Sequence, residues 1–160
     1  MADSKRSPPL EGIDLETWIA VATILEWLPP ALDASLHDIG LTHFEYGILY
    51  ALADAPDHTL RMSVLAGYAN SSLSRLSRAA SRLEAKSLVR RTPDPADGRS
   101  TLAILTDQGR HAYEAATPVH EENVRRLLLS ALTETQKKQL REIARRVMEA
   151  IQDGGAKSTP

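Results

Sequence analysis

Cysteine is absent from this chain of 160 residues. Its absence excludes disulfides, thiolate metal sites and sensors that depend on cysteine oxidation. Aromatic residues are scarce, with two Trp, four Tyr and one Phe, whereas Ala, Leu, Arg and Glu are common and favour helices. The polar first residues, MADSKRSPPLEG, contain no apolar signal-peptide core, and no apolar run approaches the roughly 20 residues of a membrane span. We therefore expect a cytoplasmic protein without a membrane partner.

Signature motifs of enzymes are missing as well. The sequence contains no glycine-rich phosphate loop, no G-x-S-x-G and no H-E-x-x-H. Its histidines include no pair at i,i+3 or i,i+4, the spacing that places two metal ligands on one helix face. The five histidines are His37, His43, His58, His111 and His120. We expect no catalytic residue, no cofactor and no metal site.

Neither sign of charge is in large excess over the whole chain, whose formal net charge is −2, but the charges are unevenly distributed. Residues 61–100 contain eight cations and three anions, which gives +5, so the rest of the chain carries −7. A basic centre between acidic ends is typical of a local nucleic-acid-binding surface. Ordinary solvated helix faces are the alternative interpretation of the same count.

Apolar periodicity predicts a single, mainly helical domain. The expected order is a disordered tail, the domain and a second disordered tail, at residues 1–13, 14–152 and 153–160. The domain divides into a central segment and two outer helical segments, at about 42–106, 14–39 and 107–152. The first outer helix should begin at Asp14 and kink or break at Pro29 and Pro30, because proline lacks the amide donor that a helix interior requires.

The central segment has the element order of a winged helix-turn-helix. Thr42, with Glu45 three residues later, predicts a capping box at the start of a helix. A short helix over residues 62–68 and a long helix over about 71–86 follow. The β-capable segments LVRR and STLAIL then flank a loop and predict a hairpin. The expected fold is therefore mainly α with a small β-hairpin wing.

The long helix has two different faces. Apolar residues recur every three or four positions along one face, at Leu73, Leu76, Ala80 and Leu83. A second face has hydroxyls and arginines without a carboxylate, and its candidate DNA-binding residues are Ser71, Ser72, Ser74, Arg75, Arg78 and Arg82. An arginine fork donates two hydrogen bonds to guanine in a major groove, and a helix start binds phosphate. Cations at helical spacing repel one another, so this face predicts an anionic partner.

The loop RRTPDPADGRST, residues 90–101, combines stiff and permissive backbone. Pro93 and Pro95 favour extended conformations, and Gly98 permits a turn. We expect Arg99 near the tip of this wing, where it would enter a minor groove. Asp97 is expected to hold the Arg99 guanidinium in place. An ordinary surface turn has the same composition, so this prediction depends on the arginine-bearing helix before it.

The stretch NSSLSRLSRAASRLEAKSLVRRTPDPADGRSTLAILTDQGR resembles the recognition helix and wing of MarR-type regulators. The matching pattern is a helix that ends in RLE, then LVRR, D-x-x-D-G-R and LT-x-x-G. With the flanking helices, the resemblance covers about residues 14–151. It implies a homodimeric transcription regulator, usually a repressor, that binds double-stranded DNA at pseudo-palindromic operators and dimerises through its N- and C-terminal helices. Asp97 and Arg99 would then take the wing roles.

The resemblance also implies an effector, because members of this family often release DNA when a small molecule, frequently a phenolic or lipophilic anion, binds between the dimerisation helices and the winged domain. Candidate effector-binding residues are Trp18, Trp27, His43, Tyr46 and Arg61, which combine apolar walls with a few polar groups. Ordinary core or dimer packing is the alternative for each.

A second function class stays open at this point. The winged helix could dock an acidic protein partner through its basic face. Sequence-selective retention on duplex DNA separates the two functions, because only base readout distinguishes one duplex from another.

Overall fold

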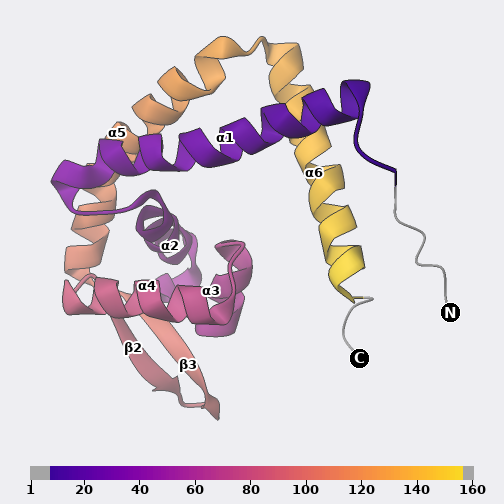
Figure 1. Cartoon of the computed structure of the whole chain (residues 1–160). Coiled ribbons are helices and arrows are strands. Elements are labelled where there is room, and N and C mark those ends of the chain that lie inside the picture. The colour runs from indigo at the N-terminus through magenta and orange to yellow at the C-terminus, as the bar shows by residue number, and fades with distance from the viewer. Residues whose placement is uncertain (1–7, 157–160) are drawn as a thin grey trace, which may run out of the picture. The chain divides into compact units, whose positions relative to one another are not determined.

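A computed structural model describes residues 8–156 (Figure 1). These residues form two compact units, with the boundary between His120 and Glu121 inside one helix, α5 (Asp107–Leu127). The chain is mainly helical with a small antiparallel sheet, which confirms the predicted winged-helix fold class. Residues 1–7 and 157–160 of the two predicted disordered tails lie outside the described residues. The described remainder of the tails includes helix at residues 12–13 and 153–156, so the predicted disorder is wrong there.

The first helix, α1 (Gly12–Leu36), continues without interruption through Pro29 and Pro30, so the predicted break does not occur. These prolines leave the carbonyls of Leu25 and Glu26 without helical donors. Both residues are exposed, so water can take the place of the missing amides. The two prolines therefore cost α1 little stability, because this part of the helix lies on the surface of its unit.

The apolar side chains of α1 are largely exposed, Trp18 and Trp27 at 54% and 76%. The helix continues into η1 (His37–Ile39) and ends at Gly40, whose positive φ of 74° suits glycine. By length and composition alone, residues Gly12–Ile39 are long and apolar enough to cross a membrane. The expectation that no segment reaches this length is therefore wrong. Core helices of soluble proteins can also be this long and apolar. The exposed fractions show that α1 has an apolar surface that the rest of its described unit does not cover.

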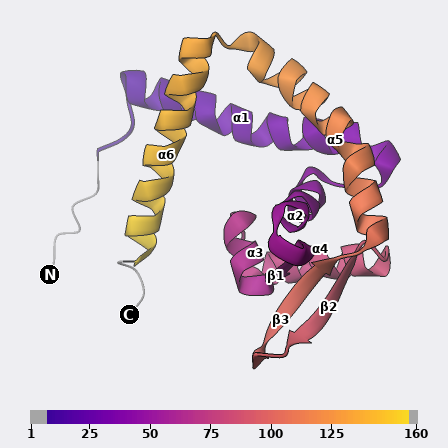
Figure 2. The ribbon, with the colours of Figure 1, turned by 180° about the vertical axis from the view of Figure 1, so that it is seen from behind.

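The central segment contains the winged helix-turn-helix (Figures 1 and 2). Its elements are α2 (His43–Asp54), η2 (Pro56–His58), β1 (Thr59–Arg61), α3 (Met62–Tyr68), α4 (Leu73–Ala85), β2 (Val89–Asp94) and β3 (Asp97–Leu105). The capping box of Thr42 and Glu45 at the start of α2 is confirmed, and α3 has the predicted bounds. Helix α4 begins at Leu73, later than predicted, because the Ser72 hydroxyl accepts the Arg75 amide as an N-cap.

The sheet has three strands in the order β1-β3-β2, one strand more than the predicted hairpin. In β1, Thr59 pairs with Ile104 and Arg61 with Leu102 of β3 (Figure 2). A strand of three residues is too short to show an alternating pattern in a sequence. The register pairs β1 with the end of β3 farthest from the turn, so the base of the wing is anchored to the segment that leads into α3.

The core lies between α2, α3, α4 and the base of the wing. Its fully buried side chains include Leu49, Leu52, Leu65, Leu76, Leu83 and Ala103. Each such leucine contributes about 1.5–3 kcal/mol through burial. The apolar face of α4 is confirmed at Leu76, Ala80 and Leu83, whereas Leu73 at the helix start is exposed. Burying one face of α4 leaves its arginine-bearing face outward.

The second unit, from Glu121, contains the end of α5, η3 (Leu129–Ala131) and α6 (Glu134–Ala156). Thr133 caps α6 by accepting the Gln136 amide, and the Gln136 side chain accepts the Thr133 amide in return. The helix extends past the predicted end at residue 152. An apolar row along α6 is exposed, at Leu140, Ile143, Val147 and Ile151.

Candidate nucleic-acid interface

Arg75 and Arg78 extend from the exposed face of α4, the second helix of the helix-turn-helix. The Arg75 guanidinium lies over the ring of Phe44, with its Cζ 4.4 Å from the ring centroid. Neither guanidinium makes a hydrogen bond or an ion pair with the described residues. Both planar forks therefore keep their donors available for an acceptor outside the chain.

The serines at the start of α4 have different roles. Ser72 is committed to capping the helix, and the Ser71 hydroxyl donates to the Ser72 carbonyl at 3.2 Å. Ser74 lies in the first turn and is exposed. The first amides of the helix and its positive dipole end accompany these hydroxyls, which makes the start of α4 suitable for a phosphate.

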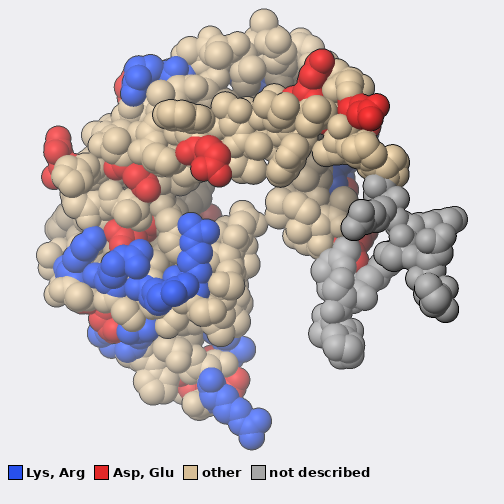
Figure 3. Space-filling view, in the orientation of Figure 1, with Lys and Arg blue, Asp and Glu red and all other residues tan. Residues whose placement is uncertain are grey.

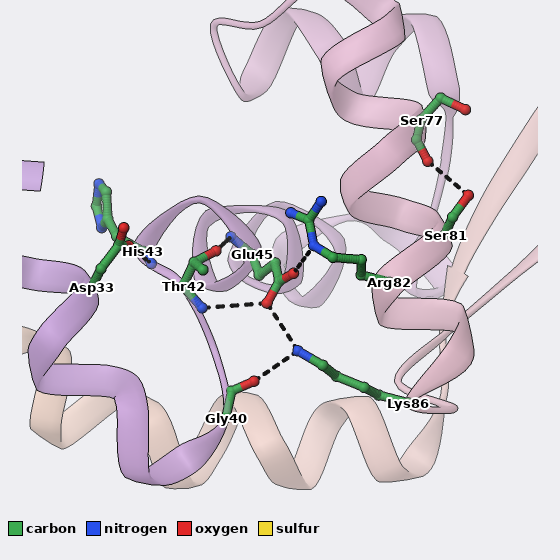
Figure 4. Close-up of polar contacts among 9 residues, drawn as sticks. All are labelled: Asp33, Gly40, Thr42, His43, Glu45, Ser77, Ser81, Arg82 and Lys86. Carbon is green, nitrogen blue, oxygen red and sulfur yellow. Dashed lines mark hydrogen bonds and ion pairs between the residues drawn. The ribbon is translucent and has the colours of Figure 1, made fainter. Parts of the chain in front are cut away.

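Arg82 is engaged by a carboxylate that the sequence pattern of α4 does not reveal. Its Nε donates to Glu45 Oε1 at 2.8 Å, and Lys86 Nζ donates to Glu45 Oε2 at 3.1 Å and to the Gly40 carbonyl at 2.8 Å (Figure 4). The arginine-bearing face of α4 has no carboxylate of its own, as the sequence shows, but α2 supplies one at the C-terminal end of that face. Arg82 therefore joins α4 to α2, and its side chain remains half exposed.

The Glu45 carboxylate is almost completely buried. Burial disfavours its charged form, but hydrogen bonds from Arg82, Lys86 and the Thr42 amide outweigh that effect. The pKa of Glu45 consequently lies below its ordinary value of 4.5. A buried carboxylate that stays ionised holds the end of α4 at a set distance from α2.

A second ion pair joins α4 to the wing. Glu84 Oε1 accepts a hydrogen bond from the backbone amide of Arg91 at 3.0 Å, and Glu84 Oε2 accepts one from Arg91 Nη2 at 2.7 Å. The side-chain bonds from Arg91 are the main cause of a lowered pKa at Glu84. Because Arg91 lies in β2, this contact sets the direction in which the hairpin leaves α4.

The turn of the wing is organised by Asp97, in a different way from that predicted. Its carboxylate accepts the hydroxyl of Ser100 at 2.8 Å and the backbone amide of Arg99 at 3.1 Å. These bonds, first the one from Ser100, hold the pKa of Asp97 below its ordinary value. The expectation that Asp97 holds the Arg99 guanidinium is wrong. That guanidinium makes no hydrogen bond or ion pair with any described residue.

Asp94 closes the other side of the turn. Its carboxylate accepts the Ala96 amide at 2.9 Å and Arg61 Nε at 2.7 Å. The bond from Ala96 and then that from Arg61 keep the pKa of Asp94 low despite burial. Arg61 comes from β1, so the added strand braces the wing through a charge as well as through its backbone pairs. Arg99 is the third residue of β3, just past the turn, which agrees with its predicted position near the tip of the wing.

The recognition helix and the wing meet at a cleft of about 250 Å³. It is lined by two arginines, by several hydroxyls and by two apolar side chains: Arg91, Arg99, Ser63, Ser77, Ser100, Thr101, Met62 and Leu73. Figure 3 shows Lys and Arg side chains gathered over α4 and again at the end of the hairpin. Ser77 belongs to the hydroxyl- and arginine-bearing face of α4, whereas the sequence prediction missed Ser63, which lies on α3. The cleft has the charge and donors of a phosphate-binding surface.

The predicted effector residues are not brought together in one place. Arg61 pairs with Asp94 in the wing, and Trp18 and Trp27 are exposed along α1. Only His43 and Tyr46 are close to one another, at a junction of α2 with α5. Within this set, His43 alone lines a cavity of about 530 Å³ beside α2.

The junction of α2 with α5 is a stack of aromatic rings. His43 Nδ1 lies 3.0 Å from His120 Nε2, and the His120 ring stacks on Tyr46 with centroids 4.1 Å apart. The Tyr46 hydroxyl lies 3.3 Å from that of Thr117. Burial lowers the pKa of His43, with Asp33 acting in the opposite direction, so His43 is mostly neutral at pH 7. These contacts pack α2 against α5.

Comparison with known proteins shows which family the chain belongs to. Residues 37–100 match the model of the MarR family. The chain is 31% identical over 110 residues to the transcriptional regulator HosA of Escherichia coli O111:H-, an alignment that covers 69% of this chain and 79% of HosA. The chain belongs to the MarR family.

Solved structures of MarR-family regulators have the same fold. Sco3205 of Streptomyces coelicolor, solved in complex with DNA, is 38% identical and superposes with a TM-score of 0.87, over 93% of this chain and 94% of Sco3205. AbsC of the same organism is 28% identical, with a TM-score of 0.86 over 92% of this chain and 99% of AbsC. This MarR-family chain is therefore a DNA-binding transcriptional regulator, and not a member of an enzyme family.

Proposed function

We propose that this protein is a homodimeric repressor that acts in the cytoplasm, reads a pseudo-palindromic operator and releases it when a small molecule binds. The observation that carries the proposal is the set of uncommitted guanidinium groups on one DNA-binding motif. Arg75 and Arg78 on α4 and Arg99 on the wing have no carboxylate partner among the described residues, whereas Arg82 and Arg91 do.

The proposed roles follow from these differences. Arg75 and Arg78 read base edges in a major groove, Ser74 and the start of α4 bind phosphate, and Arg99 enters the flanking minor groove. Asp97 shapes the wing turn, and Arg82 holds α4 on α2. The two charged side chains of the predicted set that are bonded within the chain, those of Asp97 and Arg82, thus position the residues that meet DNA.

A second copy of the chain is the proposed partner of α1 and α6. Both helices expose apolar side chains within their own units, including Leu25 of α1 and Ile143 of α6. A two-fold dimer would cover such surfaces and place two copies of α4 roughly 34 Å apart, one turn of DNA. Because the two copies of α4 would be related by two-fold symmetry, the DNA site that they bind would be an inverted repeat.

The test is selection of bound duplexes from a random pool at near-physiological salt, with the wild type and with Arg75→Ala and Arg99→Ala variants. We expect an enriched inverted repeat for the wild type. Arg75→Ala should lose about fivefold or more of the discrimination at a half-site position, because a bidentate arginine contributes about 1–3 kcal/mol there. Arg99→Ala should lose the preference in the flanks.

Arg125→Ala is the matched control, because it also removes one positive charge, from an exposed arginine of α5 that pairs with Glu122. It should enrich the same repeat as the wild type. Weak, salt-sensitive retention without any enriched sequence would contradict the proposal and favour docking of an acidic protein partner.

A further inference from the structure

The cavity of about 530 Å³ lies entirely within the first unit, between one face of α2 and the end of α3. Its volume is in the range of small-molecule sites. Three aromatic side chains, Phe44, Tyr50 and Tyr68, form much of its lining, and Gly47 of α2 leaves its floor open. A Cβ added at Gly47 would meet no atom within 4 Å. The walls therefore suit a flat apolar group.

The charge of the cavity is the reverse of the charge on the DNA-facing surface. No lysine or arginine lines it, and Asp54 is its one charged side chain. The Asp54 carboxylate makes no hydrogen bond or ion pair with any described residue. It is the last residue of α2, where the helix dipole is negative, and the last turn of that helix has no basic residue. Carboxylate and dipole both favour a cation at this position.

The aromatic lining favours a cation as well, because the face of an aromatic ring attracts positive charge. His43, at the other end of the cavity, is half buried and hydrogen-bonded to His120. Burial lowers its pKa, so it adds little positive charge at pH 7. An anionic ligand would meet Asp54 without any cation to compensate. The phenolic anion implied by the family resemblance does not fit this lining.

We propose that the cavity binds a small aromatic amine in its cationic form, with the ring between Phe44 and the tyrosines and the ammonium group at Asp54. This amine would be the effector of the proposed repressor, so its regulatory role rests on the proposed function. Phe44 links the site to DNA binding, because it lines the cavity and also lies under the Arg75 guanidinium. A ligand that shifts the Phe44 ring moves the support of a base-reading arginine.

The experiment measures binding calorimetrically in the absence of DNA, with three probes of similar size: phenethylamine, 2-phenylethanol and 3-phenylpropionate. We expect phenethylamine to bind more tightly than the neutral alcohol, and the carboxylate to bind weakest. Asp54→Asn should weaken binding of the amine by about two- to fivefold and leave the alcohol unchanged, because only the amine loses a charge interaction with this exposed carboxylate. Gly47→Leu should abolish binding of the amine by filling the cavity.

Asp57→Asn is the charge-matched control, since Asp57 lies close in sequence, does not line the cavity, and has a positive φ that asparagine tolerates. It should bind the amine as the wild type does, and thermal denaturation checks that each variant is folded. Equal or tighter binding of 3-phenylpropionate, no effect of Asp54→Asn, or no binding of the amine at millimolar concentration would each overturn the proposal.

A second measurement tests the link to DNA. Phenethylamine should lower the affinity of the wild type for its selected duplex, and Phe44→Leu, which removes the ring under Arg75, should make DNA affinity insensitive to the amine. An amine that binds without changing DNA affinity would overturn the link through Phe44. Because the calorimetry needs no DNA, failure of the ligand site and failure of operator recognition give different results.

Discussion

At the start of α2, the Glu45 carboxylate belongs to two structures. Its Oε2 accepts the Thr42 amide within the capping box. The same carboxylate pairs with Arg82, in the last turn of α4, and with Lys86, the C-cap of that helix. Removal of one partner of a buried charge pair costs more than the pair contributes when intact, because the remaining group is left without its partner. This residue therefore couples the local stability of α2 to the position of the recognition helix.

Glu45→Gln should lower the free energy of unfolding by about 1–3 kcal/mol at pH 7, since hydrogen bonds to a charged group are lost while glutamine keeps the capping box. The folded-state pKa of Glu45 is depressed, so its contribution is present above the ordinary value of 4.5 and is lost as the pH falls below it. Urea denaturation at pH 7 and at about pH 3.5 checks both expectations. A variant that is equally destabilised at both pH values would show that charge is not the cause.

Among the elements, the start of α5 packs closely on the start of β2. Thr106 caps α5 by accepting the Gly109 amide, and its hydroxyl also donates to the Leu88 carbonyl at 3.1 Å. A Cβ built at Gly109 would lie 1.9 Å from that carbonyl oxygen and 2.8 Å from a methyl group of Leu105. The closer contact is with a backbone oxygen, which cannot rotate aside as a flexible side chain can. Glycine is required at this position by the approach of a helix to a strand.

Gly109→Ala should destabilise the protein by about 1–3 kcal/mol, because α5 must move away from β2 to admit the methyl group. Gly67→Ala is its control, since a Cβ at Gly67 meets nothing within 4 Å and alanine favours a helix by about 0.5–1 kcal/mol. Thermal denaturation should show a lower Tm for the first variant and an unchanged or higher Tm for the second. Coincident melting of Gly109→Ala and the wild type would refute the packing argument.

At the scale of the whole molecule, α1 and α6 each have a row of exposed apolar side chains that the described residues do not cover. Val147 and Ile151 of α6 are more than half exposed. Ion pairs at i,i+3 and i,i+4 occupy another side of this helix, among them Arg145 with Glu142 and Glu149. An amphipathic helix of this kind is typical of an interface between subunits.

The double variant Ile143→Asp with Val147→Asp should dissociate the proposed dimer, because it places charge in an apolar interface. Sedimentation equilibrium should show half the wild-type mass, and affinity for a full inverted repeat should fall towards that for a half-site. Gln152→Asp, on another side of α6, should leave the mass unchanged. A wild type that sediments as a monomer would contradict the dimer itself.

The sequence by itself determined the features that depend on near neighbours. The Thr42 and Glu45 cap, the bounds of α3 and the separate faces of α4 arise from residues one to four positions apart, and the same spacing is visible in the sequence. Most of the fold and the arginines of the candidate DNA-binding surface could therefore be predicted. The wing motif added Arg99, since its residues are contiguous in the chain.

Only the tertiary structure decided which of those arginines remain uncommitted. Arg82 meets Glu45 across 37 positions and Arg61 meets Asp94 across 33, and no periodicity relates residues so far apart. The pairing of β1 with β3 and the cavity beside α2 escaped prediction for the same reason, because each is formed by segments that are distant in the chain. Long-range ion pairs depend on how helices and strands pack, so the division between positioning arginines and DNA-facing arginines is a property of the folded chain.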